Sequence, residues 1–196
     1  MIQNYEIYII FNPELSTDQV NQKQDLVVDL LKSNLQAENI SEKAEGLKKM
    51  AYPISKHRTG FYLLITFDSD ISLVKNISTI EKKLNLDESI LRYIIVNQTE
   101  FLKQVAKENR SDSEISNHRE LNKGKNTKKK CISKYLGLRV IDYKDVNYLN
   151  QFTSPYAKIF TRTRTGTSSK FQRKINKAIK RARHMALMPF TPIHNS

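Results

Sequence analysis

The run FYLLITF at residues 61–67 decides the fold of the first half of the chain. Seven residues are too few to cross a membrane as a helix. A short apolar run rich in aromatic and branched side chains favours a β-strand. The run therefore predicts a fully apolar strand.

Extended segments lie on both sides of this strand. Residues 40–54 precede it and predict a second strand, in which Pro53 must lie at a strand end or on a sheet edge. Residues 57–60 (HRTG) have the composition of a turn between the two strands. The runs YEIYIIF at residues 5–11 and ILRYIIV at residues 90–96 are rich in β-branched and aromatic residues. They predict the first and last strands.

Two helices are predicted between these strands. The first is capped by Ser16 or Thr17, and the second begins at Asp70 or Ser72. The residues expected to face inward are Val20, Val27, Leu31 and Leu35 in the first helix and Leu73, Ile77, Ile80 and Leu84 in the second. The element order is β-α-β-β-α-β, the ferredoxin-like pattern of the α+β class. Many functions use this fold, so the topology alone does not indicate an activity.

Charge is divided unevenly along the chain. The 196 residues have a formal net charge of +13, 39% hydrophobic residues and one cysteine, Cys131. Residues 1–102 carry 11 basic and 14 acidic side chains, whereas residues 125–196 carry 17 basic and 2 acidic ones. An acidic half joined to a strongly basic half suggests two domains with different partners. The single cysteine excludes an internal disulfide and fits a reducing compartment.

The most basic stretch is residues 161–189, TRTRTGTSSKFQRKINKAIKRARHMALMP. Its apolar residues recur at helical spacing: Phe171, Ile175, Ile179, Ala182 and Ala186. Ser168 or Ser169 can cap this helix and Pro189 can stop it. The stretch has no Asp or Glu and nine basic residues: Arg162, Arg164, Lys170, Arg173, Lys174, Lys177, Lys180, Arg181 and Arg183. It predicts a loop rich in Arg and Thr that leads into a helix with one apolar face.

These cations have two interpretations. A charge run is often only a solvated helix face, but such faces usually mix signs, because each Glu–Lys pair four residues apart stabilises a helix by about 0.3 kcal/mol. No such pair is possible in this stretch. Uncompensated cations repel one another unless a polyanion covers them, so we favour binding to RNA.

The rest of the basic half offers little apolar surface. Asp142 is predicted to cap a helix that begins at Tyr143, with Asp145 completing a capping box. The residues expected to face inward are Val146, Leu149 and Phe152. Ser154-Pro155 would end this helix, and residues 156–160 would be extended. A unit this small usually needs a partner surface or a metal to fold.

Other side chains of this half have two interpretations each. Lys128, Lys129 and Lys130 are either a basic tail that enters an RNA groove or a solubilising cluster. Tyr143, Tyr148 and Tyr156 could stack on bases, but packing into a core is favoured for aromatic residues at helical spacing.

A polar segment separates the two halves. Residues 103–126 mix both signs of charge and have no aromatic side chains and no sustained apolar period. This composition favours a flexible linker, with a short helix at residues 101–110 as an option. The expected division is a ferredoxin-like domain at residues 1–102, a linker at 103–126 and a small, mostly helical basic domain at 127–196.

Three motifs mark the first half: YEI at residues 5–7, GLKKMAYPI at residues 46–54 and ILRY at residues 90–93. At this spacing they resemble the bacterial small-subunit ribosomal protein of family six. The resemblance implies a ferredoxin-like fold, no catalytic activity, and binding to small-subunit ribosomal RNA beside a partner protein. It also implies possible RNA contacts for the basic residues at matching positions: Arg92, Lys49, Lys56 and Arg58. Each of these four could equally be an ordinary exposed charge.

A second set of motifs marks the basic half: IDYKD at residues 141–145, TGT at 165–167, FQ at 171–172, AIKRAR at 178–183 and LMPF at 187–190. Over residues 128–194 they resemble the bacterial small-subunit ribosomal protein of family eighteen. That family is small and helical and pairs with family six on the platform of the small subunit. The resemblance implies RNA contacts for the nine basic residues listed above. Family members often have a basic segment that leads to a cysteine, and Lys128, Lys129, Lys130 and Cys131 keep this feature in a variant form. The two families are normally separate chains, and here they are joined.

The expected function is therefore a structural constituent of the small ribosomal subunit that binds its RNA. Neighbouring small-subunit proteins are expected partners, and the two halves are expected to dock on each other. No membrane association, cofactor or metal is expected, although Cys131 could bind a metal with a neighbour. The expected location is the ribosome of a bacterial cytoplasm or of an organelle that encodes the protein.

Two alternatives remain at this point. One is an RNA-processing enzyme with a basic recruiting tail, which would need a general base or a metal beside the basic surface. The other is an RNA-binding regulator that works outside the ribosome. No P-loop, dinucleotide-binding or nucleophile-elbow motif is present in the sequence.

Overall fold

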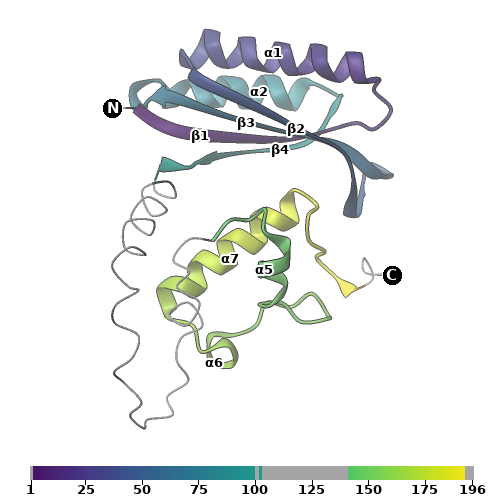
Figure 1. Ribbon diagram of the computed structural model, residues 1–196, viewed down its shortest axis with the longest axis vertical. Coiled ribbons are helices and arrows are strands. Elements are labelled where there is room, and N and C mark those ends of the chain that lie inside the picture. Colours follow the sequence, from purple (N-terminus) through teal and green to yellow (C-terminus); the bar gives the residue numbers. More distant parts are fainter. Residues whose placement is uncertain (1, 100–101, 103–140, 193–196) are drawn as a thin grey trace, which may run out of the picture. The chain divides into compact units, whose positions relative to one another are not determined.

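The computed structural model describes residues 2–99, 102 and 141–192 (Figure 1). They belong to two compact units. The first consists of the residues up to Thr99 together with His184–Ala186. Of the second, the described residues are 102, 141–183 and 187–192. The linker predicted at residues 103–126 and the optional helix at 101–110 lie outside the described residues, apart from Leu102.

The first unit is built on a four-stranded antiparallel sheet. Its strands are β1 (Ile2–Phe11), β2 (Glu38–Ile54), β3 (His57–Asp70) and β4 (Ile90–Asn97), in the spatial order β2-β3-β1-β4. The apolar run at residues 61–67 lies in β3, an inner strand. Pro53 lies near the end of β2, an outer strand, where its missing N–H breaks no inner ladder. The predicted ferredoxin-like order is confirmed.

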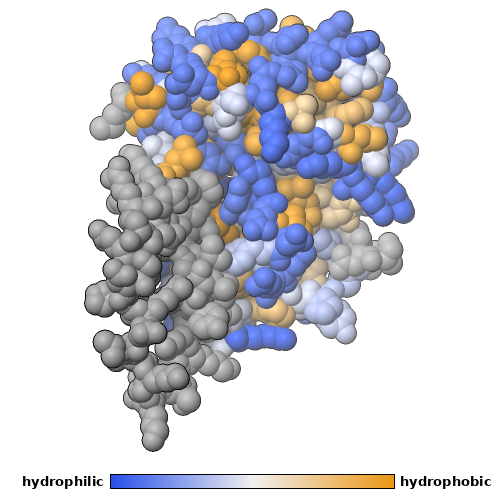
Figure 2. Space-filling view, viewed as in Figure 1, coloured by the Kyte–Doolittle hydropathy of each residue, from blue (hydrophilic) through white to orange (hydrophobic). Residues whose placement is uncertain are grey.

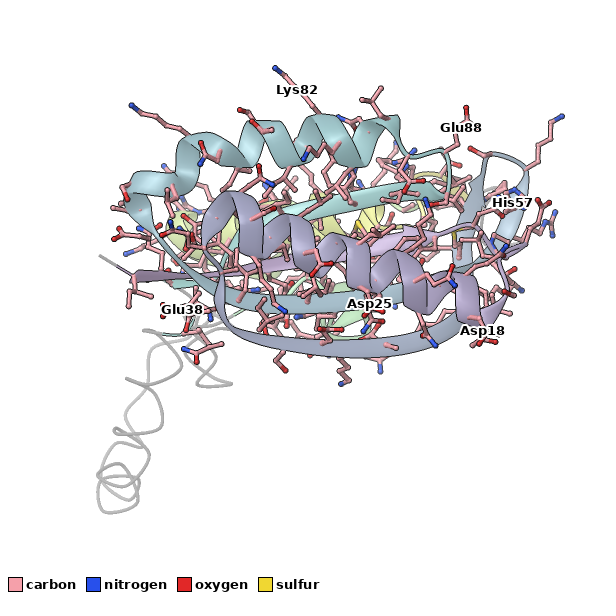
Figure 3. The ribbon with its side chains drawn as sticks, turned by 90° about the horizontal axis from the view of Figure 1, so that it is seen from above. Asp18, Asp25, Glu38, His57, Lys82 and Glu88 are labelled. Carbon is pink, nitrogen blue, oxygen red and sulfur yellow. The ribbon has the colours of Figure 1, made fainter. Side chains whose placement is uncertain are left out.

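Helices cover one face of this sheet. They are α1 (Thr17–Leu35), the 3-10 helix η1 (Ile71–Asn76) and α2 (Ile77–Leu86). Figures 1 and 3 show α1 and α2 side by side across the strands. Ser16 caps α1 because its side chain accepts from the Gln19 backbone N–H, while the Gln19 side chain accepts from the Ser16 N–H. This is the reciprocal capping box that fixes where a helix begins.

The core lies between the helices and the sheet. Alternate residues of β1 point into it, and Ile7, Ile9 and Phe11 are fully buried there. The predicted inward residues of α1 are all buried, and α2 contributes Ile80 and Leu84. The outer side of the helices is polar: Asp18 and Asp25 of α1 and Lys82 of α2, all labelled in Figure 3, are exposed. Figure 2 shows a mostly hydrophilic surface in the region of α1 and α2, with scattered hydrophobic residues.

Two boundary predictions in this unit are wrong. The turn between β2 and β3 is Ser55-Lys56, not residues 57–60, and Ile54 pairs directly with His57. Ser55 and Lys56 have φ of 48° and 71°, as a tight two-residue hairpin turn requires, but neither residue type favours that conformation. The second helix starts as the 3-10 turn at Ile71, and its α-helical part begins only at Ile77.

The sheet face away from the helices is also apolar at its centre. Tyr8, Ile10 and Tyr62 point to this face and are fully buried, and the rings of Tyr8 and Tyr62 lie 5.5 Å apart. The Tyr8 hydroxyl donates to Glu45 Oε2 at 2.5 Å, and the Lys48 Nζ lies 2.7 Å from the same oxygen. Burial, followed by the Glu45 hydrogen bond, raises the pKa of Tyr8 above its ordinary value. This tyrosine therefore stays neutral and acts as a donor.

The short segment His184–Ala186 belongs to this first unit. Its backbone carbonyls accept hydrogen bonds from the sheet. The Ala51 backbone N–H donates to the Ala186 carbonyl at 2.7 Å, and the Tyr62 hydroxyl donates to the Met185 carbonyl at 3.1 Å. Met185 and Ala186 are buried. The Ala51 N–H of β2 and the Tyr62 hydroxyl of β3 thus have hydrogen-bond acceptors that lie more than 100 residues away in the sequence.

The second unit is small and helical. It contains α5 (Val146–Asn150), α6 (Arg162–Thr165) and α7 (Ser169–His184). Leu149 and Phe152 are fully buried, and the ring of Phe152 meets that of Phe171 edge-on, with centroids 6.4 Å apart. Ile175 and Ile179 of α7 are also fully buried. The fold therefore consists of α7 laid over the α5 region through one aromatic and aliphatic cluster.

Four local predictions in this unit need correction. Asp145, not Asp142, caps α5, because its carboxylate accepts from the Tyr148 N–H, whereas Asp142 accepts from the Lys144 N–H in a turn. The helix ends at Asn150, before Ser154-Pro155. Residues 156–160 form a tight turn and a bridge between Thr153 and Ile159 rather than one extended segment. The loop before α7 contains the one-turn helix α6, which the sequence pattern was too short to reveal.

The end of α7 also differs from its prediction. The helix stops at His184, five residues before Pro189. Ala186 has a φ of 51°, and the Leu187 N–H donates back to the Ala182 carbonyl at 2.9 Å. This is the Schellman arrangement that closes a helix through a left-handed residue. The backbone therefore ends the helix before the proline is reached.

Candidate RNA-binding surface

The helix α7 separates its apolar and cationic side chains. Its buried residues are Phe171, Ile175, Ala178, Ile179 and Ala182. Its exposed cations are Lys170, Arg173, Lys177 and Lys180, and Lys174 and Arg181 are half-buried. Residues 173, 177 and 180 follow one another at steps of four and three, which places them in a single row on the helix. The row can lie along a polyanion while the other face stays in the core.

The short helix α6 adds two more cations beside the start of α7. Arg162 and Arg164 are both exposed. The Arg162 guanidinium donates to the Ser169 Oγ at 2.5 Å, at the first residue of α7. Arg164 lies flat on Phe160, with its guanidinium carbon 3.9 Å from the ring centroid. An arginine held in this way keeps its N–H edge available for phosphate oxygens.

A tight turn joins α6 to α7. Gly166 has a left-handed φ of 66° and its N–H donates to the Arg162 carbonyl at 2.8 Å, which closes α6. The Ser168 Oγ then accepts from the Phe171 N–H at 3.3 Å and caps α7. Glycine adopts this backbone conformation without strain. The sequence TGTSS therefore brings the two arginines of α6 next to the first turn of α7.

Arg183 points into its own unit instead of outward. It is half-buried, its guanidinium donates to the Ala157 carbonyl, and it lies 5.7 Å from the centroid of the Phe190 ring. Burial lowers the pKa of Arg183 from its ordinary value, yet an arginine remains protonated at neutral pH. The geometry favours a structural role for Arg183 within the second unit, and its predicted RNA contact stays a prediction.

Arg92 of β4 is also engaged inside its unit. It is half-buried, and its Nη1 lies 3.3 Å from both the Tyr52 hydroxyl and the His184 carbonyl. Lys49, Lys56 and Arg58, by contrast, are exposed around the β2–β3 turn. Their RNA contacts and that of Arg92 stay predictions. The cluster Lys128, Lys129 and Lys130 lies outside the described residues.

Two family models match separate parts of the chain. The model described as ribosomal protein S6 matches residues 4–97, and the model described as ribosomal protein S18 matches residues 137–188. The small ribosomal subunit protein bS18 of Phocaeicola vulgatus is 54% identical to this chain over 63 residues, which cover 32% of this chain and 71% of that relative. The chain belongs to the bS18 family. It carries, in the same polypeptide, an S6-type domain that precedes the bS18 part.

Further matches cover one part of the chain each. The bS18 protein of Flavobacterium johnsoniae is 53% identical over 64 residues, 33% of this chain and 65% of that protein. The chain thus spans about 65% of the length of the Flavobacterium relatives that it matches. The crystal structure of the 30S ribosomal protein S6 from Thermotoga maritima is 21% identical, with a TM-score of 0.49, and the match covers 56% of this chain and 100% of that one.

The bS18 part also exposes Tyr156, for which base stacking is one of the two interpretations above, and Lys158, which the sequence did not single out for RNA. Tyr156 is 69% exposed at the tip of the turn after Pro155, and Lys158 is exposed two residues later. The prediction that Tyr156 packs in a core is wrong, whereas Tyr143 is buried and Tyr148 meets Phe152 edge-on. The signal that could have found Tyr156 is its place between a proline and a lysine, outside any helical period.

The described residues contain neither a metal-binding cluster nor a membrane-spanning helix. Within residues 2–99, 102 and 141–192, no three His, Cys, Asp or Glu side chains gather closely enough to hold a metal ion. In the same ranges, no helix is both long and apolar enough to traverse a bilayer. Cys131 lies outside the described residues.

Proposed function

We propose that this chain is a structural constituent of the small ribosomal subunit that binds ribosomal RNA in the platform through α6 and α7. The observation that carries the proposal is the row of exposed cations on α7, together with Arg162 and Arg164, in a stretch without a single acidic residue. The bS18 and S6 families, both named as ribosomal proteins, support it.

The mechanism is charge neutralisation on a preformed surface. Each Lys or Arg that meets a phosphate releases condensed counterions, so the affinity falls as salt rises. The apolar face of α7 is fixed in a core, and Arg164 is held on Phe160. The cations are therefore presented by a rigid element, which favours a folded RNA with phosphates at fixed spacing.

The two halves are proposed to act together by docking on each other. The S6-type sheet has a second apolar face with Tyr8, Ile10 and Tyr62. The bS18 part has a core too small to be expected to fold without a partner surface. The acidic character of residues 1–102 and the basic character of residues 125–196 also favour their attraction.

Location and chemistry follow from this role. The ribosome of a bacterial cytoplasm is the proposed location, and an organelle that encodes the chain is the other. No catalytic step is proposed, because a scaffold for RNA requires binding groups rather than a base and a nucleophile. Neighbouring small-subunit proteins are proposed as further contacts.

A charge-reversal experiment tests the RNA assignment. The variant R173E/K177E/K180E changes three exposed residues in the row on α7. We expect it to lose binding to transcribed small-subunit ribosomal RNA in a filter assay while keeping its helix content. The matched control K75E/K82E/K83E reverses three exposed lysines on the helical layer of the S6-type domain. It should bind RNA nearly as the parent does.

RNA binding and sedimentation together distinguish a ribosomal protein that binds RNA through α7 from the alternatives. If the parent and the α7 variant bind RNA equally, the assignment of α7 is wrong. A parent that binds RNA but fails to sediment with small subunits in a high-salt gradient would instead indicate a regulator that acts outside the ribosome.

A further inference from the structure

A chain of polar side chains ties α6 to α7 inside the bS18 part. The Thr167 hydroxyl donates to the Gln172 Oε1 at 2.5 Å, and the hydroxyls of Thr165 and Thr167 lie 2.9 Å apart. The Gln172 Nε2 donates to the Phe160 carbonyl at 3.0 Å and to the Asn176 Oδ1 at 3.2 Å. Thr165 and Thr167 are 8% and 3% exposed. These hydroxyls are thus shielded from water and depend on partners within the protein.

The orientation of the Gln172 amide follows from its partners. The Phe160 carbonyl can only accept, so the amide nitrogen of Gln172 faces it and the amide oxygen faces Thr167. Thr167 then donates to Gln172. The Thr165 hydroxyl has three acceptors within reach: the Thr167 Oγ1 at 2.9 Å, the Thr161 carbonyl at 3.2 Å and the Gln172 Oε1 at 3.4 Å. The roles of Gln172 and Thr167 are thereby defined. A glutamate or a leucine at position 172 cannot reproduce this order.

The network holds both ends of α6. Phe160 comes just before the helix and carries the ring on which Arg164 lies, and Thr165 is its last residue. A helix of one turn has no stability of its own, because nucleation fixes several residues for one hydrogen bond. The contacts at Phe160 and Thr165 therefore decide where Arg162 and Arg164 lie relative to α7.

We propose that Gln172 is a positioning residue for RNA binding: through Thr165, Thr167 and the Phe160 carbonyl it holds Arg162 and Arg164 in register with the cations of α7. This inference rests on the proposed RNA-binding function. Gln172 is half-buried and uncharged, so its effect on RNA is exerted through the two arginines.

The test uses the full chain and transcribed small-subunit ribosomal RNA over a series of salt concentrations. We expect Q172L to weaken binding by about tenfold. We also expect the slope of log affinity against log salt, which is negative, to become less steep by about one to two. A neutral substitution changes that slope only if phosphate contacts made by other residues are lost. On an R162A/R164A background, Q172L should have almost no further effect, because the residues through which it acts are absent.

A matched pair protects the test against misfolding. T167V removes the hydroxyl with almost no change in shape, whereas T167S keeps it. We expect T167V to behave as Q172L and T167S as the parent, with equal helix content by circular dichroism. If Q172L fails to fold, the comparison of T167V with T167S still tests whether the network positions Arg162 and Arg164 for RNA binding.

The proposal is overturned if Q172L and T167V bind RNA with the parent's affinity and salt slope while R162A/R164A is weakened. It is also overturned if Q172L weakens binding equally on the R162A/R164A background. A parent chain without RNA affinity overturns the proposed function itself, which is a different result from either of these.

Discussion

The guanidinium of Arg164 lies over the ring of Phe160, 3.9 Å from its centroid, at the start of the most basic part of the chain. Stacking fixes the plane of the guanidinium without using its N–H groups. The cation is thereby presented before any RNA arrives, which lowers the entropy that binding would otherwise lose.

Replacing the ring tests this arrangement. We expect F160L to weaken RNA binding by roughly threefold, because an exposed cation–π contact contributes about 0.5–1 kcal/mol. R164K should show a similar loss although it keeps the charge, and R164A should show a larger one. Filter binding at constant salt measures all three. Equal affinities for R164K and the parent would mean that charge alone matters at this position.

Tyr156 provides a second prediction in the bS18 part. Its ring is 69% exposed at the tip of a tight turn, so Y156A should leave the melting temperature unchanged. If the ring stacks on a base, the variant should bind RNA about tenfold more weakly, since stacking contributes roughly 1–3 kcal/mol per base. Y156F is the control, because it keeps the ring and should bind as the parent does. An unchanged affinity for Y156A would show that the ring faces solvent.

The S6-type domain contains an ion pair with a defined pH dependence. Partial burial alone would raise the pKa of Asp87, but the Lys23 ammonium at 2.7 Å and two hydrogen bonds from Ser89 hold the pKa below its usual value. A depressed carboxyl pKa stabilises the fold above the unfolded-state pKa of about 3.9, and that contribution is lost as pH falls through the folded value.

The variant D87N should therefore be less stable than the parent by about 1 kcal/mol at pH 7, with the difference shrinking below pH 4. Urea unfolding at pH 7 and pH 3 measures both values. A difference of the same size at the two pH values would contradict an electrostatic origin.

Gly60 allows a close approach between β3 and β1. A Cβ at this position would lie 2.6 Å from the Ile10 Cγ2 and 3.3 Å from the Phe11 carbonyl oxygen. We expect G60A to destabilise the domain by roughly 1–3 kcal/mol, as overpacking of a rigid core usually does. Thermal unfolding measures this loss. G46A is a useful contrast: a Cβ there meets nothing within 4 Å, so only its φ of 77° is unfavourable.

Docking of the two halves can be tested by cutting the chain. A protease site placed within residues 103–126 would separate the S6-type and bS18 parts without changing either. We expect the fragments to elute together in size-exclusion chromatography at low salt. The substitution Y62A, on the apolar second face of the sheet, should promote their separation. Fragments of the cut parent that elute apart at micromolar concentration would contradict docking.

The regular elements of the S6-type domain were predictable because burial imposes a period on the sequence. Val20, Val27 and Leu31 repeat at helical spacing, and the runs around Tyr8 and Leu63 have the composition of strands. The hairpin turn was missed because the left-handed conformations of Ser55 and Lys56 leave no trace in residue type. The 3-10 start of the second helix was missed because the same apolar spacing fits both helix types.

The charge of the candidate site could be predicted from the sequence, but the directions in which its basic side chains point could not. Composition identified the basic stretch, yet it could not separate the exposed Lys177 from Arg183, which points inward to the Ala157 carbonyl. The network around Gln172 was also hidden, since a single glutamine in a basic helix gives no periodic signal. These features depend on tertiary contacts, which the local sequence does not contain.

The outer strand β2 has a consequence for the life of the protein before RNA is available. Its exposed side chains include Glu38, Glu42, Lys43, Lys48 and Lys49. Charges of both signs along an open strand discourage the backbone of a second molecule from adding to the ladder. In the proposed ribosomal role, a newly made chain would therefore await its RNA with little tendency to form β-aggregates through this edge.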